Sequence, residues 1–116
     1  MANNKEELRS QLNKLIDEVS RTKHSEMLSD FKQFNSHFEP YDGLIVNFIQ
    51  SVSRNLFTKN IVGKLKKYVT DILDNFESYS PIDKEKVQKF LYDMFIKYGN
   101  VEKTFLDKLL SVLRGS

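Results

Sequence analysis

The chain has 116 residues, and its 18 Lys and Arg residues exceed the 16 Asp and Glu residues by two. A chain of this length buries one core without needing covalent staples, so the sequence predicts one domain over residues 1–116, with residues 1–4 and 114–116 flexible. The absence of cysteine excludes disulfides and thiol catalysis. A net charge of +2 is too balanced to indicate a nucleic-acid partner by itself.

Targeting signals are missing from the sequence as given. No apolar run approaches the roughly 18 residues that a membrane-spanning helix needs. The first residues show neither the apolar stretch of a signal peptide nor the Arg-rich pattern of a transit peptide. We therefore expect a cytoplasmic protein without a membrane span.

Apolar residues recur at three- and four-residue spacing along nearly the whole chain, and this period predicts helices. The first expected helix covers about residues 4–22, with charged residues filling the positions between its apolar ones. The second covers about residues 24–37 and ends before Glu39, because the residue that precedes a proline is pushed out of the α region.

A third expected helix follows the proline and is the most apolar, with core positions from Leu44 to Phe57. The fourth follows Thr58 as an N-cap and carries apolar residues from Ile61 to Phe76, unless the third and fourth helices are continuous; the sequence leaves both arrangements open. Gly63 lies inside this helix, where glycine costs about 1 kcal/mol relative to alanine. It therefore indicates a close helix crossing or a kink.

Ser80 and Pro81 mark the clearest helix start, because serine is a good N-cap and proline fits the first helical position. We expect Gly99 to end this fifth helix in the left-handed conformation, with Asn100 starting a sixth helix that is apolar from Val101 to Leu113. Wide apolar stripes are typical of globular packing rather than of a two-stranded coiled coil. The predicted fold class is all-α, a compact single-domain bundle of five to six amphipathic helices.

Catalytic and metal-binding patterns are not found in this sequence. His24 and His37 are the only side chains that titrate near neutrality unperturbed, and thirteen helical residues place them about 220° apart around one axis. Zinc needs three or four suitable ligands, and no histidine pair has helical spacing. We therefore predict no catalytic, cofactor-binding or metal-binding residues, no cofactor, and a protein that is not an enzyme.

The basic stretch 54–67 is the most informative surface feature, because no acidic residue occurs between Asp42 and Asp71. Its lysines fall on the polar side of the fourth helix or at its rim. Tyrosines at predicted helix ends add amphipathic rings that anchor partners at low entropic cost. The candidate partner-binding residues are Arg54, Lys59, Lys64, Lys67, Tyr41 and Tyr79.

Elimination leads to the leading hypothesis, a non-enzymatic helical interaction or regulatory module that binds a protein partner. One alternative is a nucleic-acid-binding protein that uses the basic stretch 54–67. Another is a sensor domain whose phenylalanine-rich core encloses an apolar ligand. The apolar terminal helix, residues 101–113, either closes the bundle or forms a homodimer face.

Overall fold

The computed structural model describes residues 4–38, 59–99 and 101–114. These residues form five α-helices and one 3-10 turn, and no strand occurs among them, which confirms the all-α fold class. None of the described helices is long and apolar enough to cross a membrane. The elements are α1 (Asn4–Thr22), α2 (His24–Ser36), α4 (Lys59–Asp74), the 3-10 turn η2 (Phe76–Ser78), α5 (Pro81–Tyr98) and α6 (Lys103–Arg114).

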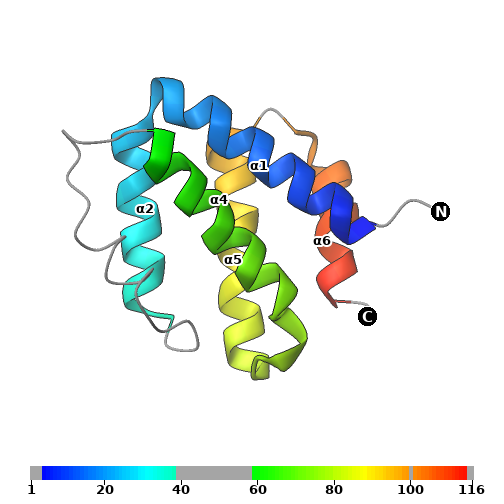
Figure 1. The fold of residues 1–116 in the computed structure, drawn as a ribbon. Helices are drawn as coiled ribbons and strands as arrows, with labels where there is room; N and C mark the ends of the chain where they lie inside the picture. Colours follow the sequence, from blue (N-terminus) through cyan, green and yellow to red (C-terminus); the bar gives the residue numbers. More distant parts are fainter. Residues whose placement is uncertain (1–3, 39–58, 100, 115–116) are drawn as a thin grey trace.

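Helix α1 is the element against which the other described helices gather (Figure 1). Its backbone comes near α4 and α6, and also near α2 and α5. The face that packs against them is the expected apolar stripe, and all of its members are buried. They are Leu8, Leu12, Leu15, Ile16 and Val19.

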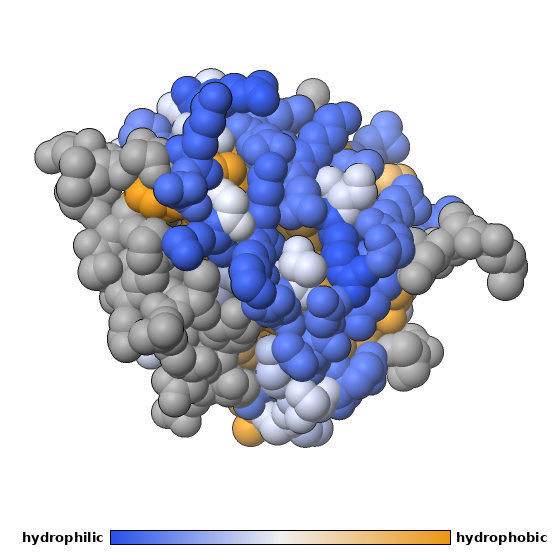
Figure 2. Space-filling view, viewed as in Figure 1, coloured by the Kyte–Doolittle hydropathy of each residue, from blue (hydrophilic) through white to orange (hydrophobic). Residues whose placement is uncertain are grey.

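The outward side of this layer is polar. Figure 2 shows that the described surface of α1 and α4 in this view is mainly hydrophilic. Arg9 on α1 contacts Asp74 on α4, and Lys66 on α4 lies 2.6 Å from Asp17 on α1. The same pair of helices therefore shares apolar contacts inside and ion pairs outside.

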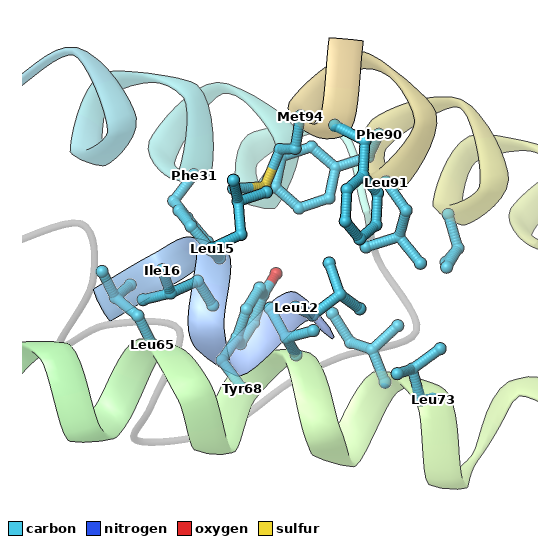
Figure 3. Close-up of a cluster of buried hydrophobic side chains, with 14 of the residues drawn as sticks. Leu12, Leu15, Ile16, Phe31, Leu65, Tyr68, Leu73, Phe90, Leu91 and Met94 are labelled. Atoms are coloured by element: carbon cyan, nitrogen blue, oxygen red, sulfur yellow. The ribbon is translucent and has the colours of Figure 1, made fainter. Parts of the chain in front are cut away.

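An aromatic junction joins α2, α4 and α5 in the centre of the core (Figure 3). The ring of Phe31 lies edge-on to Tyr68 at 6.0 Å and to Phe90 at 5.3 Å between centroids. The fully buried Tyr68 hydroxyl donates a 2.9 Å hydrogen bond to Asn35 Oδ1, and Asn35 is itself buried. This bond satisfies polar groups that would otherwise be costly to bury.

Local sequence signals fixed most helix ends correctly. Residues 4–22 form α1 as expected, and α2 begins at His24 and ends within a residue of its expected end. Ser80 caps α5, since its Oγ accepts a hydrogen bond from the Asp83 N–H at 3.2 Å, and Pro81 is the first helical residue. Phe76, expected in the fourth helix, lies in η2 and is buried.

Gly99 was predicted wrongly as a left-handed cap. Its backbone is extended, with φ −86° and ψ 158°, and the next helix begins only at Lys103. A Cβ at Gly99 would lie 2.7 Å from the Phe95 carbonyl oxygen. Glycine is therefore needed here for a close approach to the preceding turn and not for a positive φ.

Gly63 does not mark a close crossing between described helices. A Cβ there would meet no described atom within 4 Å, and the alternative expectation, a kink, stays a prediction. The helix expected from Leu44 to Phe57, and its join to α4, lie outside the described residues.

The buried hydrogen bond gives the first prediction. Tyr68→Phe removes the donor and leaves the Asn35 carbonyl oxygen without this bond, so we expect the free energy of unfolding to fall by about 1–2 kcal/mol. Urea denaturation followed by circular dichroism measures it. Tyr92→Phe is the control, because the half-buried Tyr92 hydroxyl makes no hydrogen bond within the described part of the chain. Equal stability of the two variants would contradict the role of the Asn35 bond.

The two glycines give opposite expectations for one substitution. Gly63→Ala adds a methyl group to open space in a helix interior and should stabilise the protein by up to about 1 kcal/mol. Gly99→Ala forces the Phe95 carbonyl to move and should destabilise it by about 1 kcal/mol or more. Melting temperatures of both variants test this pair, and a shift of the same sign in both would count against it.

Candidate functional site

A half-open groove of about 670 Å³ lies between α2 and α5. Its volume falls within the range of roughly 300–1,000 Å³ that is typical of binding clefts. Apolar side chains form its floor, and charged side chains stand along it. The lining residues are Asp30, Gln33, Phe34 and His37 from α2 and its C-terminal end, and Lys86, Lys89, Phe90, Asp93, Met94, Ile96 and Lys97 from α5.

Helical spacing explains why these residues share a groove. The α2 members follow one another by three, one and three positions, which places them on one helix face. Across the groove the Phe34 ring stacks on Phe90 at 4.2 Å with 13° between the planes, and it stacks on Phe38 at 4.9 Å. The two helices therefore meet through stacked rings, which form the floor of the groove.

Helices α2 and α5 run in opposite directions (Figure 1), so each end of the groove brings the end of one helix beside the start of the other. At one end Lys86 Nζ donates a 3.1 Å hydrogen bond to the His37 carbonyl oxygen. At the other end Lys97 Nζ lies 3.0 Å from Asp30 and 3.1 Å from Glu26. These side chains tie the end of each helix to the start of the other.

The Asp30 end is a tight polar cluster. Hydrogen bonds to Asp30, and next to Glu26, raise the pKa of the Lys97 ammonium. The Tyr98 hydroxyl donates to Asp30, and burial together with this bond raises the pKa of the Tyr98 phenol. Asp30 is thus held by one ammonium and one phenol from α5.

The His37 ring has a defined tautomer. Its Nδ1 lies 3.0 Å from the Gln33 carbonyl oxygen and 3.0 Å from Ser36 Oγ. A carbonyl oxygen only accepts, and the Ser36 hydroxyl already donates to that same carbonyl at 2.8 Å. Nδ1 therefore carries the proton, and Nε2 is the nitrogen with a lone pair in the neutral ring.

Ile96 is an apolar residue on the rim of the groove with a side chain that is 53% exposed. An exposed isoleucine alone needs no explanation, but one beside an apolar floor extends a single patch. The sequence of α5 contains a sign of this exposed patch, because Ile96 is apolar but lies outside the stripe from Val87 to Phe95 that packs into the core. The sequence predicted a phenylalanine-rich core but not the groove that Phe34, Phe90 and Met94 line.

The chain matches no known family model, curated protein or solved structure. Within the described ranges no group of three or more His, Asp or Glu side chains is placed to hold a metal ion.

The sequence-predicted binding residues that the structure describes do not line the groove. Lys59 and Lys64 are exposed on α4, and Lys67 is paired with Asp71 at 3.0 Å. Tyr79 is half-buried, with its ring edge-on to Phe38 at 5.2 Å, and burial is the main cause that raises the pKa of its phenol. Arg54 and Tyr41 lie outside the described residues.

The expected dimer face on the terminal helix is largely used within the chain. Helix α6 packs on α1 and α5, and its four leucines are buried there. Phe105 is 37% exposed on the same helix. The helix therefore closes the bundle, and the homodimer stays a prediction.

The cluster around Asp30 predicts a pH-dependent contribution to stability. Asp30→Asn weakens two hydrogen bonds and should lower the free energy of unfolding by about 1 kcal/mol at neutral pH, after allowing for solvent screening. A raised lysine or tyrosine pKa stabilises the fold fully below its unfolded value, about 10 for both groups, and the stabilisation is lost as pH rises through the folded value.

Urea unfolding between pH 7 and 11 measures this effect, and the difference between wild type and Asp30→Asn should narrow above about pH 10. Asp93→Asn is the control, because the Asp93–Lys89 pair is exposed and one turn apart, so its loss should cost less than about 0.5 kcal/mol. A constant difference across this pH range would show that Asp30 does not stabilise the protonated partners.

Proposed function

We propose that this protein is a non-enzymatic interaction module that binds a protein partner in the groove between α2 and α5, and that it acts in the cytoplasm as an adaptor or regulator. One observation carries the proposal: the groove has an apolar floor, formed by Phe34, Phe90 and Met94, and Ile96 on its rim is 53% exposed. Covering such a patch removes apolar area from water, which is the main favourable term in association.

The arrangement of the groove supports a protein partner. Interfaces between proteins have an apolar centre and a polar rim, and here charged residues from both helices surround the apolar floor. A groove between two helices is also the usual receptor for an amphipathic helix, whose anchor residues recur every three or four positions. The floor rests on side chains of the core, so it is held in place before the partner arrives.

The hydrophilic face of α1 and α4 is a weaker candidate for a binding surface. Lys66 and Lys67 each have a carboxylate partner within 3.0 Å, which dilutes the positive field of the basic stretch. Binding of nucleic acid through residues 54–67 therefore remains an untested alternative, supported by sequence composition alone.

The volume of the groove favours one second candidate, the sensor. About 670 Å³ would also hold a small apolar molecule. In that case native mass spectrometry of protein purified from its source would show an added mass that Ile96→Asp removes.

The test of protein binding uses two matched isoleucines on α5. Wild type, Ile96→Asp and Ile82→Asp are immobilised and exposed to lysate of the source cell, and captured proteins are quantified by mass spectrometry. Ile96 lines the groove, whereas Ile82 is 68% exposed at the start of the same helix and does not. We expect at least one protein to be captured by wild type and Ile82→Asp and lost at least tenfold with Ile96→Asp.

Both isoleucines are exposed, so neither substitution should unfold the protein, and circular dichroism checks this. Equal capture by all three proteins would show that the groove is not the binding surface. Loss of capture with both variants would point to a different apolar surface on α5.

A further inference from the structure

We propose that the groove accepts an amphipathic partner helix in one direction, with its acidic N-terminal turn at Lys86 and Lys89 and a basic residue at the Asp30 end. This inference rests on the proposed function and adds the chemistry and orientation of the partner. It is carried by the unequal charge at the two ends of the groove.

At the His37 end the positive charge is incompletely matched. Lys86 Nζ donates to a neutral carbonyl, and its ion contact among the described residues is with Asp83, at 4.0 Å. Lys89 is paired with Asp93 at 3.4 Å, but both side chains are mostly exposed, so this pair is weak. Among the described residues, both ammonium groups are therefore held only by long or exposed contacts, which they can exchange for a carboxylate of the partner.

At the Asp30 end the negative charge exceeds the positive. Lys97 serves two carboxylates at once, those of Asp30 and Glu26, at 3.0 and 3.1 Å. One ammonium between two carboxylates leaves a net charge of about −1 at this end of the groove. A lysine or arginine of the partner would complete the cluster, whereas a carboxylate there would be repelled.

The length of the groove sets the spacing in the partner. His37 and Asp30 are seven residues apart on α2, which corresponds to about 10 Å along a helix. On α5, Lys86 and Lys97 are eleven residues apart, so the acidic and basic residues of a partner helix should be about seven to eleven positions apart, with apolar anchors on the same face. The floor formed by Phe34, Phe90 and Met94 lies between the two ends and receives these anchors.

The partner's own structure favours the same direction. A helix is stabilised by acidic residues in its first turn and basic residues in its last, because of its macrodipole. With its first turn at Lys86 and its last at Lys97, the partner helix would run parallel to α5 and antiparallel to α2. In the reverse direction such a helix would place its carboxylate beside Asp30 and Glu26.

The test is a selection from phage-displayed 16-residue peptides with fixed apolar residues at i, i+3, i+4 and i+7 and random residues elsewhere. The library is selected on wild type in about 50 mM salt and depleted on Ile96→Asp. We expect the enriched peptides to carry Asp or Glu in the first turn and Lys or Arg about seven to eleven positions later. The opposite order, no charge bias or no enriched peptide would each overturn the inference.

A charge swap provides the second arm, measured by fluorescence anisotropy with an enriched peptide. Lys86→Glu/Lys89→Glu should weaken binding about tenfold, and a peptide with lysine in its first turn should bind this variant more tightly than wild type. Lys14→Glu on the exposed side of α1 is the control and should bind as wild type does. Equal affinity of the double variant and wild type would contradict the assigned direction.

The two proposals fail separately. Capture of a cellular protein that is lost with Ile96→Asp supports the protein-binding function whatever the charge bias of the peptides. If that capture is unchanged by Lys86→Glu/Lys89→Glu and the peptides show no order of charges, the direction is wrong and the binding function stands.

Discussion

The contact on which the rest of the structure depends is the buried junction of Phe31, Tyr68 and Phe90 (Figure 3). Helix α2 follows α1 after a single residue, Lys23, so the chain alone fixes where α2 begins but not where its far end lies. The aromatic junction holds that far part against α4 and α5. Because aromatic rings are large and rigid, they set the distance between α2 and α5 and thereby the width of the groove.

The hydrogen bond between Tyr68 and Asn35 adds specificity to this junction. Apolar side chains tolerate shifts of a helix by several tenths of an ångström, but a buried hydroxyl and amide retain their bond only within a narrow range of distance and angle. If α2 shifted along α4, the Tyr68 hydroxyl and the Asn35 amide would stay buried but lose this hydrogen bond, and burying polar groups without the bond costs free energy. Asn35 lies one position after Phe34, so the bond that fixes α2 also fixes the floor of the groove.

The sequence contains the helices but only part of what positions the site. The stripe on α1 and the Ser80–Pro81 start of α5 depend on neighbours within a turn, and such signals are local in the sequence. The left-handed conformation predicted for Gly99 was wrong because two different backbone arrangements favour glycine at a helix end. One is a left-handed cap, and the other is the close approach of an extended residue to the preceding turn, which the structure has. The groove depends on Phe34 and Phe90, which are 56 positions apart, and no local pattern reports their stacking. Ile96 is an apolar residue outside the core stripe of α5, but so is Ile82, which does not line the groove, so this local sign alone does not locate the site.

The distribution of charge also cannot be predicted from the sequence alone, and this distribution affects which partners the protein can bind. Along the chain, the stretch around Lys66 and Lys67 is the most basic, whereas the start of α5 mixes both signs and attracts no notice. In space part of this charge is matched, because Asp17 reaches Lys66 from another helix, while the Lys86 ammonium lies 3.1 Å from a carbonyl oxygen and 4.0 Å from Asp83. A folded protein attracts a charged partner where neutralisation by its own side chains is incomplete, and that property belongs to the packing of helices rather than to a segment. The α2–α5 groove combines weakly matched charge with the exposed Ile96, and this combination is why we propose the groove, rather than the basic stretch, as the binding surface.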